Sequence, residues 1–353
     1  MMKIGLLTFH DTNNFGSYLQ TYGLYKKVIE LGCDCEIIDY KCQAIHEREN
    51  YGKYHLDLNP KHIIAQLLFN GSIRTKYKNL MRWLKENSSL SNSYSISNIK
   101  MAANKYDKFI VGSDIVWGLD ITQKDTTFFL DFLDDSKKKY AFSSSIGNPW
   151  SAEDKKLLAP MLRSFRGIAV REVEAVEWVR ELTDNSPTLV CDPTMLLTSS
   201  DWAKFASSKY KSRKYVLLYF PTKEGIRDAQ LIAKRYDAEC LVINYGTPLK
   251  GLTTVKPTNL ADFLSLFLNA SFVCTGSYHG MLFSIYFNRE FAYYNRAHKS
   301  RMNSLASILG VQNREGTRYS VTTMDKIDYK KVNTAVNNFR IQSIDCLEKM
   351  LKQ

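Results

Sequence analysis

Short apolar runs that end in polar turns and lead into helical patterns recur along this chain, and they constrain its fold more than any other feature. Residues 3–9 form such a run, a polar turn follows, and apolar side chains near helical spacing then extend from 17 to 31. Gly32 ends this helix, and residues 36–40 form the next apolar run. A strand, a helix and a second strand within so short a span predict a parallel crossover unit.

The same order returns in two sets. In the first set we expect further strands at 108–111, 140–143, 167–170 and 189–191. In the second set we expect strands at 215–220, 240–244, 272–275 and 290–294, and helices at 223–236, 262–269, 279–287 and 330–351. The sequence therefore predicts an α/β protein with two doubly wound, Rossmann-like lobes that face a cleft.

The chain length supports two lobes, because 353 residues are too many for one ordinary core. A polar stretch of mixed charge at 196–213 separates the two sets of strands. We therefore expect an N-terminal lobe at 1–197 and a C-terminal lobe at 198–329, followed by a closing helix at 330–353.

Residues 41–105 interrupt the order of strands and are predicted to be a helical insertion in the first lobe. The stretch 41–110 carries 12 basic and 5 acidic residues. This excess of 7 positive charges is more than half of the net charge of +12. Within 73–85, basic and apolar residues interleave at helical spacing. This pattern fits a solvated helix that packs by its apolar stripe, or a basic amphipathic helix on an anionic membrane surface.

The net charge of +12 predicts an acidic partner, and the sequence contains no aromatic and basic module of the kind that binds nucleic acid. The seven cysteines have neither metal nor redox spacing, which indicates reduced thiols. The first apolar run is too short for a signal peptide, and no stretch approaches the roughly 20 apolar residues that cross a bilayer. These features together predict a cytoplasmic protein.

The turn at 275–280 carries the clearest chemical signal. Gly276 permits a sharp turn after a strand, and a helix then begins with His279 in its first turn. Helix starts attract anions through their amide groups and dipole, and a histidine there can donate a proton to an anionic substrate. Gly280 removes side-chain bulk beside such a ligand. The alternative is a histidine that only caps or packs.

The first polar turn supplies groups that can either bind sugar hydroxyls or cap the helix, and the sequence leaves both readings open for Asn13, Asn14, Gly16, Ser17 and Gln20. His10 is interpreted as structural.

Arg171 follows a strand end, and Arg296 and Arg301 follow the last strand. Their guanidinium groups match the geometry of carboxylate and phosphate. Lys299, in the same stretch, is interpreted as ordinary surface charge.

Several common kinds of site are excluded because the chain lacks their sequence motifs. The first turn has no G-x-G-x-x-G, which leaves dinucleotide binding unsupported, and the chain has no P-loop. It has neither zinc-ligand spacing nor a G-x-S-x-G elbow. We therefore expect no metal site and no cofactor.

A series of short motifs follows one another at 14–20, 106–114 with Trp117, 129–132, 140–147, 171–172, 192–197 and 275–280 with 283–287. In order and spacing they resemble the polysaccharide pyruvyl transferase family. The resemblance implies a fold similar to GT-B glycosyltransferases, phosphoenolpyruvate as co-substrate and a saccharide acceptor. The product would be a cyclic pyruvate ketal across two hydroxyls of one sugar, with release of phosphate.

The resemblance also implies roles for residues of this chain. The histidine of the strand-to-helix turn and an arginine after an earlier strand serve the donor in the family, and these fall on His279 and Arg171. Donor-binding residues are then expected at Gly276, Ser277, Tyr278, Gly280, Arg296 and Arg301. Acceptor-binding residues are expected at Asn14, Gly16, Ser17, Gln20, Ser113, Asp114, Trp117 and Ser145.

One position departs from the family pattern. Some branches carry an arginine two residues before the histidine, where this chain has Ser277. We expect Arg296 or Arg301 to supply the missing positive charge.

Two further expectations concern the setting of the reaction. Bacterial capsules and exopolysaccharides are built on lipid carriers, so the acceptor is expected to be lipid-linked and the protein to contact the inner membrane face peripherally. The alternative function is a GT-B glycosyltransferase that uses a nucleotide-sugar donor on the same fold.

Overall fold

The computed structural model describes residues 1–49, 51–52, 60–183, 186–296 and 299–353, with the side chains of 60–62, 65–68 and 299–300 left out. The chain forms two compact units. Unit 1 comprises Met1–Glu49, Trp83–Leu197 and Val336–Gln353, and unit 2 comprises Asn50–Arg82 and Thr198–Ala335. Residues 50–82, which we expected in the first lobe, therefore group with the second unit, and most of the closing helix groups with the first.

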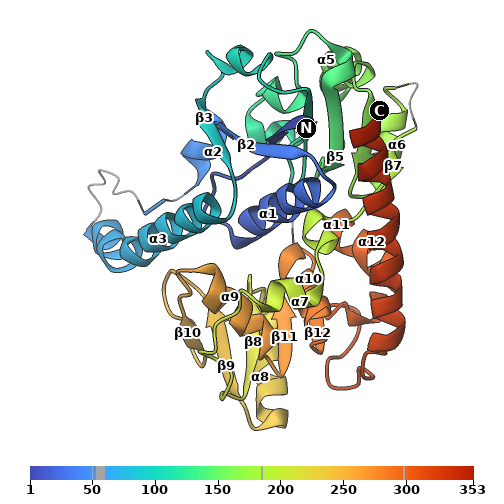
Figure 1. Cartoon of the computed structure of the whole chain (residues 1–353). Coiled ribbons are helices and arrows are strands. Elements are labelled where there is room, and N and C mark those ends of the chain that lie inside the picture. The colour runs from blue at the N-terminus through green and yellow to red at the C-terminus, as the bar shows by residue number, and fades with distance from the viewer. Residues whose placement is uncertain (50, 53–59, 184–185, 297–298) are drawn as a thin grey trace. The chain divides into compact units, whose positions relative to one another are not determined.

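Unit 1 is built on a parallel sheet of seven strands in the order β3-β2-β1-β4-β5-β6-β7. Figure 1 labels β2, β3, β5 and β7 of this sheet. Its strands are β1 (Lys3–Leu7), β2 (Asp34–Tyr40), β3 (Leu90–Tyr94), β4 (Lys108–Val111), β5 (Lys139–Ser144), β6 (Gly167–Val170) and β7 (Thr188–Leu189). Its helices are α1 (Phe15–Glu30), α2 (Gln43–Arg48), α4 (Leu119–Thr122), α5 (Ala152–Arg163) and α6 (Val173–Arg180), with short 3-10 turns η1 (Ile99–Ala102), η2 (Thr126–Phe129), η3 (Ser136–Lys138) and η4 (Pro193–Leu196).

Unit 2 is built on a parallel sheet of five strands in the order β10-β9-β8-β11-β12. The strands are β8 (Tyr215–Tyr219), β9 (Glu239–Ile243), β10 (Thr253–Val255), β11 (Phe272–Thr275) and β12 (Phe291–Tyr293). The helices are α7 (Ser199–Ala203), α8 (Lys223–Tyr236), α9 (Leu260–Leu268), α10 (Tyr278–Tyr286) and α11 (Lys299–Leu309), with the 3-10 turn η5 (Gln312–Arg314). Two long helices, α3 (Pro60–Asn87) and α12 (Tyr329–Lys352), begin in unit 2 and end in unit 1.

The central strands are buried along their whole length, which explains why they read as continuous apolar runs rather than alternating ones. Each unit has its own hydrophobic core. In unit 1 the ring of Trp117 stacks on Phe129 with centroids 5.4 Å apart, and Trp150 packs beside both.

The end of α12 is fixed to the sheet of unit 1 by polar contacts. Lys108 is buried on β4 and donates to the carbonyls of Met350 and Leu351 at 3.1 and 2.6 Å, where the helix leaves carbonyls unsatisfied. The Ser343 hydroxyl accepts from the amide of Cys191 at 2.8 Å. Burial lowers the pKa of Lys108, as expected for an ammonium group removed from water.

Two edge strands were missed by the sequence interpretation. Residues 41–105 were predicted without strands, but β3 pairs in parallel with β2 at one edge of the sheet of unit 1. β10 similarly pairs with β9 at the edge of unit 2. Both are short and only partly buried, so neither has the apolar run by which the central strands were recognised. All seven cysteines are free thiols, as expected.

The strand orders locate one switch point in each sheet, where the direction of winding reverses and ligands of open parallel sheets bind. In unit 1 it lies between β1 and β4. In unit 2 it lies between β8 and β11. The turns that follow these four strands contain most of the residues singled out from the sequence.

Candidate active site

The turn after β11 is held by its own side chains. Thr275 ends the strand, and its hydroxyl accepts from the amide of Ser277 at 3.1 Å. Ser277 caps α10, because its side chain accepts from the amide of Gly280 at 3.3 Å. The first turn of α10 is thereby fixed at the switch point of unit 2.

The two glycines of this turn are required by close approach of other atoms. A Cβ at Gly276 would lie 2.5 Å from the carbonyl oxygen of Phe220, at the end of β8. A Cβ at Gly280 would lie 2.3 Å from the Thr275 hydroxyl oxygen. No side chain fits at either position without a shift, so the turns after β8 and β11 are packed directly against each other.

His279 lies in the first turn of α10 and is 7% exposed. Its ring meets Tyr278 edge-on, with centroids 5.6 Å apart. The Arg301 guanidinium lies 5.8 Å from the Tyr278 ring centroid, and that of Arg296 lies 5.2 Å from the ring centroid of Phe220. Two cations therefore lie against aromatic rings that border the histidine turn.

The donor-binding residues expected from sequence are thus gathered in one place within unit 2. A helix start contributes partial positive charge, and the guanidinium groups add full charges that can match carboxylate and phosphate. The charge expected in place of an arginine at Ser277 is present nearby, on Arg296 and Arg301. Chemically, the site can bind a small dianion beside an imidazole.

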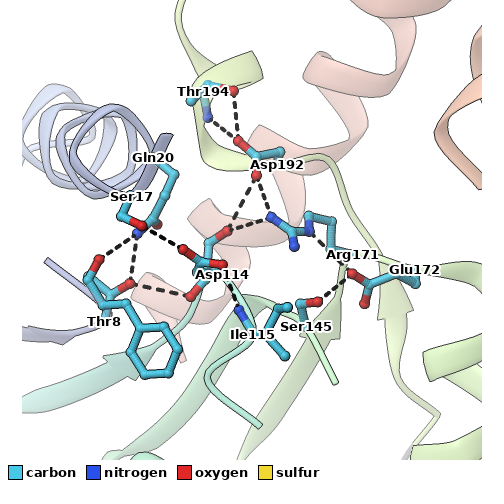
Figure 2. Close-up of polar contacts among 12 residues, drawn as sticks. Thr8, Ser17, Gln20, Asp114, Ile115, Ser145, Arg171, Glu172, Asp192 and Thr194 are labelled. Carbon is cyan, nitrogen blue, oxygen red and sulfur yellow. Dashed lines mark hydrogen bonds and ion pairs between the residues drawn. The ribbon is translucent and has the colours of Figure 1, made fainter. Parts of the chain in front are cut away.

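A second cluster lies at the carboxyl ends of the strands of unit 1, and Figure 2 shows its centre. Arg171, directly after β6, lies with one guanidinium nitrogen 2.7 Å from a carboxylate oxygen of Asp192. Its Nε lies 3.3 Å from Glu172, and Nη1 lies 3.4 Å from the Ser113 hydroxyl. The side chains of Arg171, Glu172 and Asp192 are at most 2% exposed, so this is a buried cation between two carboxylates.

Both carboxylates are held by neighbouring groups as well. Asp192 caps η4 and accepts from the amide and hydroxyl of Thr194 at 2.9 and 2.7 Å. Ser145 donates to Glu172 from the end of β5 (Figure 2). The cluster therefore ties together the segments that follow four strands of the sheet, β4, β5, β6 and β7.

Asp114 lies beside this cluster and is less buried than it. Its carboxylate accepts from the Ser17 hydroxyl at 2.7 Å and from the amide of Ile115 at 2.9 Å. Its backbone has a left-handed φ of 62°, which is uncommon for a residue other than glycine. Ser17 is on α1 and Asp114 follows β4, so their hydrogen bond spans the switch point of unit 1 (Figure 2).

The expected acceptor residues divide into two groups by their burial. Ser17, Gln20, Ser113, Trp117 and Ser145 are at most 1% exposed. Of these, Trp117 is a core residue, since its ring stacks inside unit 1 and its Nε1 donates to the Phe128 carbonyl at 2.9 Å. Its expected role in acceptor binding does not fit this position. Gln20 donates to Thr8 and Ser17 donates to Asp114, so both stabilise the cluster from within.

Of the residues expected to bind the acceptor, Asn14 and Asp114 are the partly exposed ones. The side chain of Asn14 accepts from the amide of Gly16 at 3.0 Å and caps α1, which supports the capping reading of the first turn. Asp114 is therefore the partly exposed carboxylate among the residues expected to bind the acceptor.

A further ion cluster lies after β1 and β2. His10 is buried, and its Nε2 lies 2.8 Å from Asp39. Lys41 lies 2.9 Å from Asp39 and 2.8 Å from Asp11. Burial alone would raise the pKa of Asp39, but hydrogen bonds and charge from His10 and Lys41 hold it well below its usual range. Nδ1 of His10 also faces the Thr8 carbonyl oxygen at 3.3 Å, so the ring is engaged on both nitrogens and is structural, as predicted.

The sequence interpretation gave no role to Glu172, Asp192 or Phe220. Asp192 entered the sequence analysis only within the motif at 192–197, and Glu172 only within the motif at 171–172. The signal that could have paired Asp192 with Arg171 is their position, since each residue follows one of two successive strands.

Among the described residues, no group of three or more His, Cys, Asp or Glu side chains is arranged to hold a metal ion.

No helix in the described part of the chain is both long and apolar enough to span a bilayer.

Several solved structures resemble this chain. The UDP-GlcNAc 2-epimerase from Neisseria meningitidis has a TM-score of 0.54 at 8% identity, and the alignment covers 99% of this chain and 100% of the epimerase. The UDP-GlcNAc 2-epimerase from Methanocaldococcus jannaschii has a TM-score of 0.48 at 12% identity, with 96% and 93% covered. UGT89C1 from Arabidopsis thaliana has a TM-score of 0.45 at 10% identity, with 99% of each chain covered.

At such low identity these similarities describe the fold alone. Two parallel α/β sheets of this kind, together with the similarity to the Neisseria epimerase, make the fold GT-B-like, as the family resemblance implied. A search of curated protein sequences finds no significant match.

The family comparison is more specific than the structural one. The model of the family described as polysaccharide pyruvyl transferase matches residues 14–298, which span the switch points of both sheets, the buried arginine cluster and the histidine turn. Since this match covers most of the chain, the protein belongs to the polysaccharide pyruvyl transferase family.

Proposed function

We propose that this protein transfers the pyruvyl group of phosphoenolpyruvate to two hydroxyls of one sugar in a surface polysaccharide precursor, forming a cyclic ketal and releasing phosphate. Family membership supports pyruvyl transfer to a saccharide. The observation that carries the donor assignment is the histidine turn, where His279 lies in the first turn of α10 with Arg296 and Arg301 close by.

Phosphoenolpyruvate is a small ligand with two anionic groups, a carboxylate and a phosphate. A helix start and two guanidinium groups match this charge and its planar oxygen pairs. Gly276 allows the turn after β11 to pack directly against the end of β8, and Gly280 leaves room for the Thr275 hydroxyl beside the helix start. The imidazole of His279 then serves as the acid that protonates the methylene carbon of the enol.

The atoms balance in two steps. Protonation of the methylene carbon forms the methyl group and makes the adjacent carbon electrophilic, and the first sugar hydroxyl adds to it. Phosphate then leaves with the electrons of the C–O bond, and the second hydroxyl closes the ring. Two hydroxyl protons are released in all; one replaces the proton used on the methyl group and the other leaves with phosphate.

On the acceptor side, Asp114 is proposed to orient a sugar hydroxyl and take up its proton as the new C–O bond forms. The Ser17 hydroxyl donates to one oxygen of the Asp114 carboxylate, and the amide of Ile115 donates to the other. These two hydrogen bonds hold the carboxylate in position. It is also more exposed than the carboxylates of Glu172 and Asp192, whose charge Arg171 offsets.

For Arg171, the geometry favours a positioning role over direct contact with the donor. Its side chain is 1% exposed and already lies between Asp192 and Glu172. We propose that it holds the turn that carries Ser113, and through it Asp114, at the edge of the sheet.

The test is phosphate release by the purified chain with phosphoenolpyruvate and a panel of free and lipid-linked oligosaccharides. We expect release only when donor and acceptor are both present, and a product heavier than the acceptor by one pyruvate less one water. Phosphoenolpyruvate left unchanged while a nucleotide sugar is consumed would instead identify a glycosyltransferase.

His279→Ala supplies the matched variant, with His46→Ala on α2 as the histidine control outside the site. We expect the first to lower turnover by about 10²–10⁴-fold, the usual contribution of a general acid, and the second to leave it unchanged. Full activity of His279→Ala would remove the imidazole from the mechanism.

A further inference from the structure

Among the described side chains of α3 in unit 2, the exposed ones lie on one narrow face of the helix. The exposed positions of α3 up to Arg82 with described side chains are Ile63, Ile64, Gly71, Arg74, Thr75, Lys78 and Arg82. At 3.6 residues per turn, all of them fall within about one third of the helix circumference. This face is unusual for an exposed helix because it combines large apolar side chains with basic ones.

The opposite face of α3 is packed within unit 2. Lys76 is buried with its ammonium group 4.1 Å from the ring centroid of Tyr245. Tyr77 packs edge-on against Tyr51 with ring centroids 4.5 Å apart. The ammonium group of Lys256 lies over the ring of Phe69, 4.9 Å from its centroid. The helix is therefore held by that side, and the exposed face cannot turn inward.

The charge on the exposed face is not balanced locally. The sequence contains no Asp or Glu between positions 58 and 85. Within the described part of the chain, Arg74, Lys78 and Arg82 make no ion pair. By contrast, exposed lysines at the end of α12 pair with acids one turn away, as Lys349 does with Asp345 at 2.6 Å.

Ile63 and Ile64 extend this basic face with apolar surface. They are 43% and 56% exposed, and both lie within the same third of the helix circumference as the three cations. These isoleucines share a helix face with unpaired cations that begin about 15 Å further along the axis. Such a face fits a partner that offers negative charge at its surface and an apolar layer beneath it. A lipid bilayer has this layered chemistry, whereas a nucleic acid would not desolvate the isoleucines.

We propose that the α3 basic face, defined as Ile63, Ile64, Arg74, Lys78 and Arg82, docks unit 2 on an anionic membrane surface. The cations face the lipid headgroups, and the isoleucines enter the boundary between headgroups and acyl chains. A lipid-linked acceptor would be concentrated at the same surface, but the docking itself requires neither donor nor acceptor.

The test is flotation of the full-length protein with vesicles of zwitterionic lipid alone or with a quarter of anionic lipid. The parent protein floats only with the anionic vesicles and dissociates as salt is added. Since each cation near an anionic leaflet strengthens binding by about fivefold, Arg74→Gln with Lys78→Gln and Arg82→Gln lowers the partition coefficient by roughly a hundredfold.

Two further variants separate specific docking from general charge. Lys211→Gln with Lys234→Gln and Lys330→Gln removes the same charge from exposed positions elsewhere in unit 2 and leaves binding close to that of the parent. Ile63→Ser with Ile64→Ser weakens binding at every salt concentration.

Three results would each overturn the proposal. The two triple variants could lose vesicle binding equally, or the parent could fail to bind anionic vesicles. The third is that the parent binds nucleic acid and that the basic-face triple variant loses this binding. Phosphate release with a soluble saccharide is independent of these outcomes. A failure of membrane docking is therefore distinguishable from a failure of the proposed reaction.

Discussion

Replacing Arg171 by alanine removes the guanidinium that lies 2.7 Å from Asp192 and 3.3 Å from Glu172. Both carboxylates remain buried, and Asp192 keeps its hydrogen bonds from Thr194, so neither is free to move to solvent. Breaking a buried pair by removing one partner costs about 3–5 kcal/mol, because it leaves uncompensated charge. For a unit of this size, such a loss lowers the melting temperature by roughly 6–20 °C.

The assay is chemical denaturation of the parent and of Arg171→Ala, followed by tryptophan fluorescence, which reports on unit 1 through Trp117 and Trp150 and on unit 2 through Trp202. The matched control is Arg180→Ala, which removes an arginine 2.5 Å from Glu177 with both side chains at least half exposed. That exposed pair contributes at most about 1 kcal/mol. Adding Asp192→Asn to Arg171→Ala removes one stranded charge, so the double variant should lose less stability than the two single losses added together.

A loss of stability below about 1 kcal/mol in Arg171→Ala, together with a raised KM for phosphoenolpyruvate, would refute this reasoning. It would mean that the guanidinium reaches the donor, as expected from the family resemblance, and that its pairing with the two carboxylates is incidental.

The remaining predictions concern other parts of the molecule. Gly276→Ala places a Cβ 2.5 Å from the Phe220 carbonyl oxygen, so we expect a loss of about 1–3 kcal/mol in thermal unfolding, and unchanged stability would show that the two turns can separate. Asp114→Asn removes the proposed proton acceptor. It should lower kcat by a larger factor than it changes the KM for phosphoenolpyruvate, and an unchanged kcat would exclude that role. The pKa of Asp39 is lower in the folded chain than its unfolded value of about 3.9, so Asp39 contributes stability above that pH and loses it on acidification. Asp39→Asn should therefore flatten the acid limb of the curve of stability against pH, and an unaltered limb would contradict the pairing with His10 and Lys41.

The central strands could be predicted from the sequence because they are buried on both faces. The strand expected at 167–170 is β6, and the one expected at 272–275 is β11. β3 and β10 could not be predicted in this way, since an edge strand exposes one side and carries polar residues.

The histidine turn was predictable for a local reason. A strand end, two glycines and a helix start are consecutive in the chain, so the sequence alone determines their proximity. Arg296 lies against Phe220 instead because β8, β11 and β12 are neighbours in the sheet of unit 2. The sequence alone does not give this strand order.

The arginine cluster of unit 1 was only partly predictable. The sequence identified Arg171 after a strand, with Glu172 as the next residue, but it does not give the sheet order that brings Asp192 to the same guanidinium. Trp117 shows the opposite error, because a residue of a conspicuous motif was assigned to the ligand although it stabilises the core beneath the site.

Pyruvyl transfer with protonation by His279 is tested most directly by running the reaction in deuterium oxide and examining the product by mass and NMR. We expect a saccharide ketal whose methyl group carries one solvent-derived deuterium, with phosphate released in equal amount, and formation of this product about 10²–10⁴-fold more slowly by His279→Ala. A product that retains the methylene group as an enol ether, or a labelled ketal formed at the parent rate by His279→Ala, would contradict it.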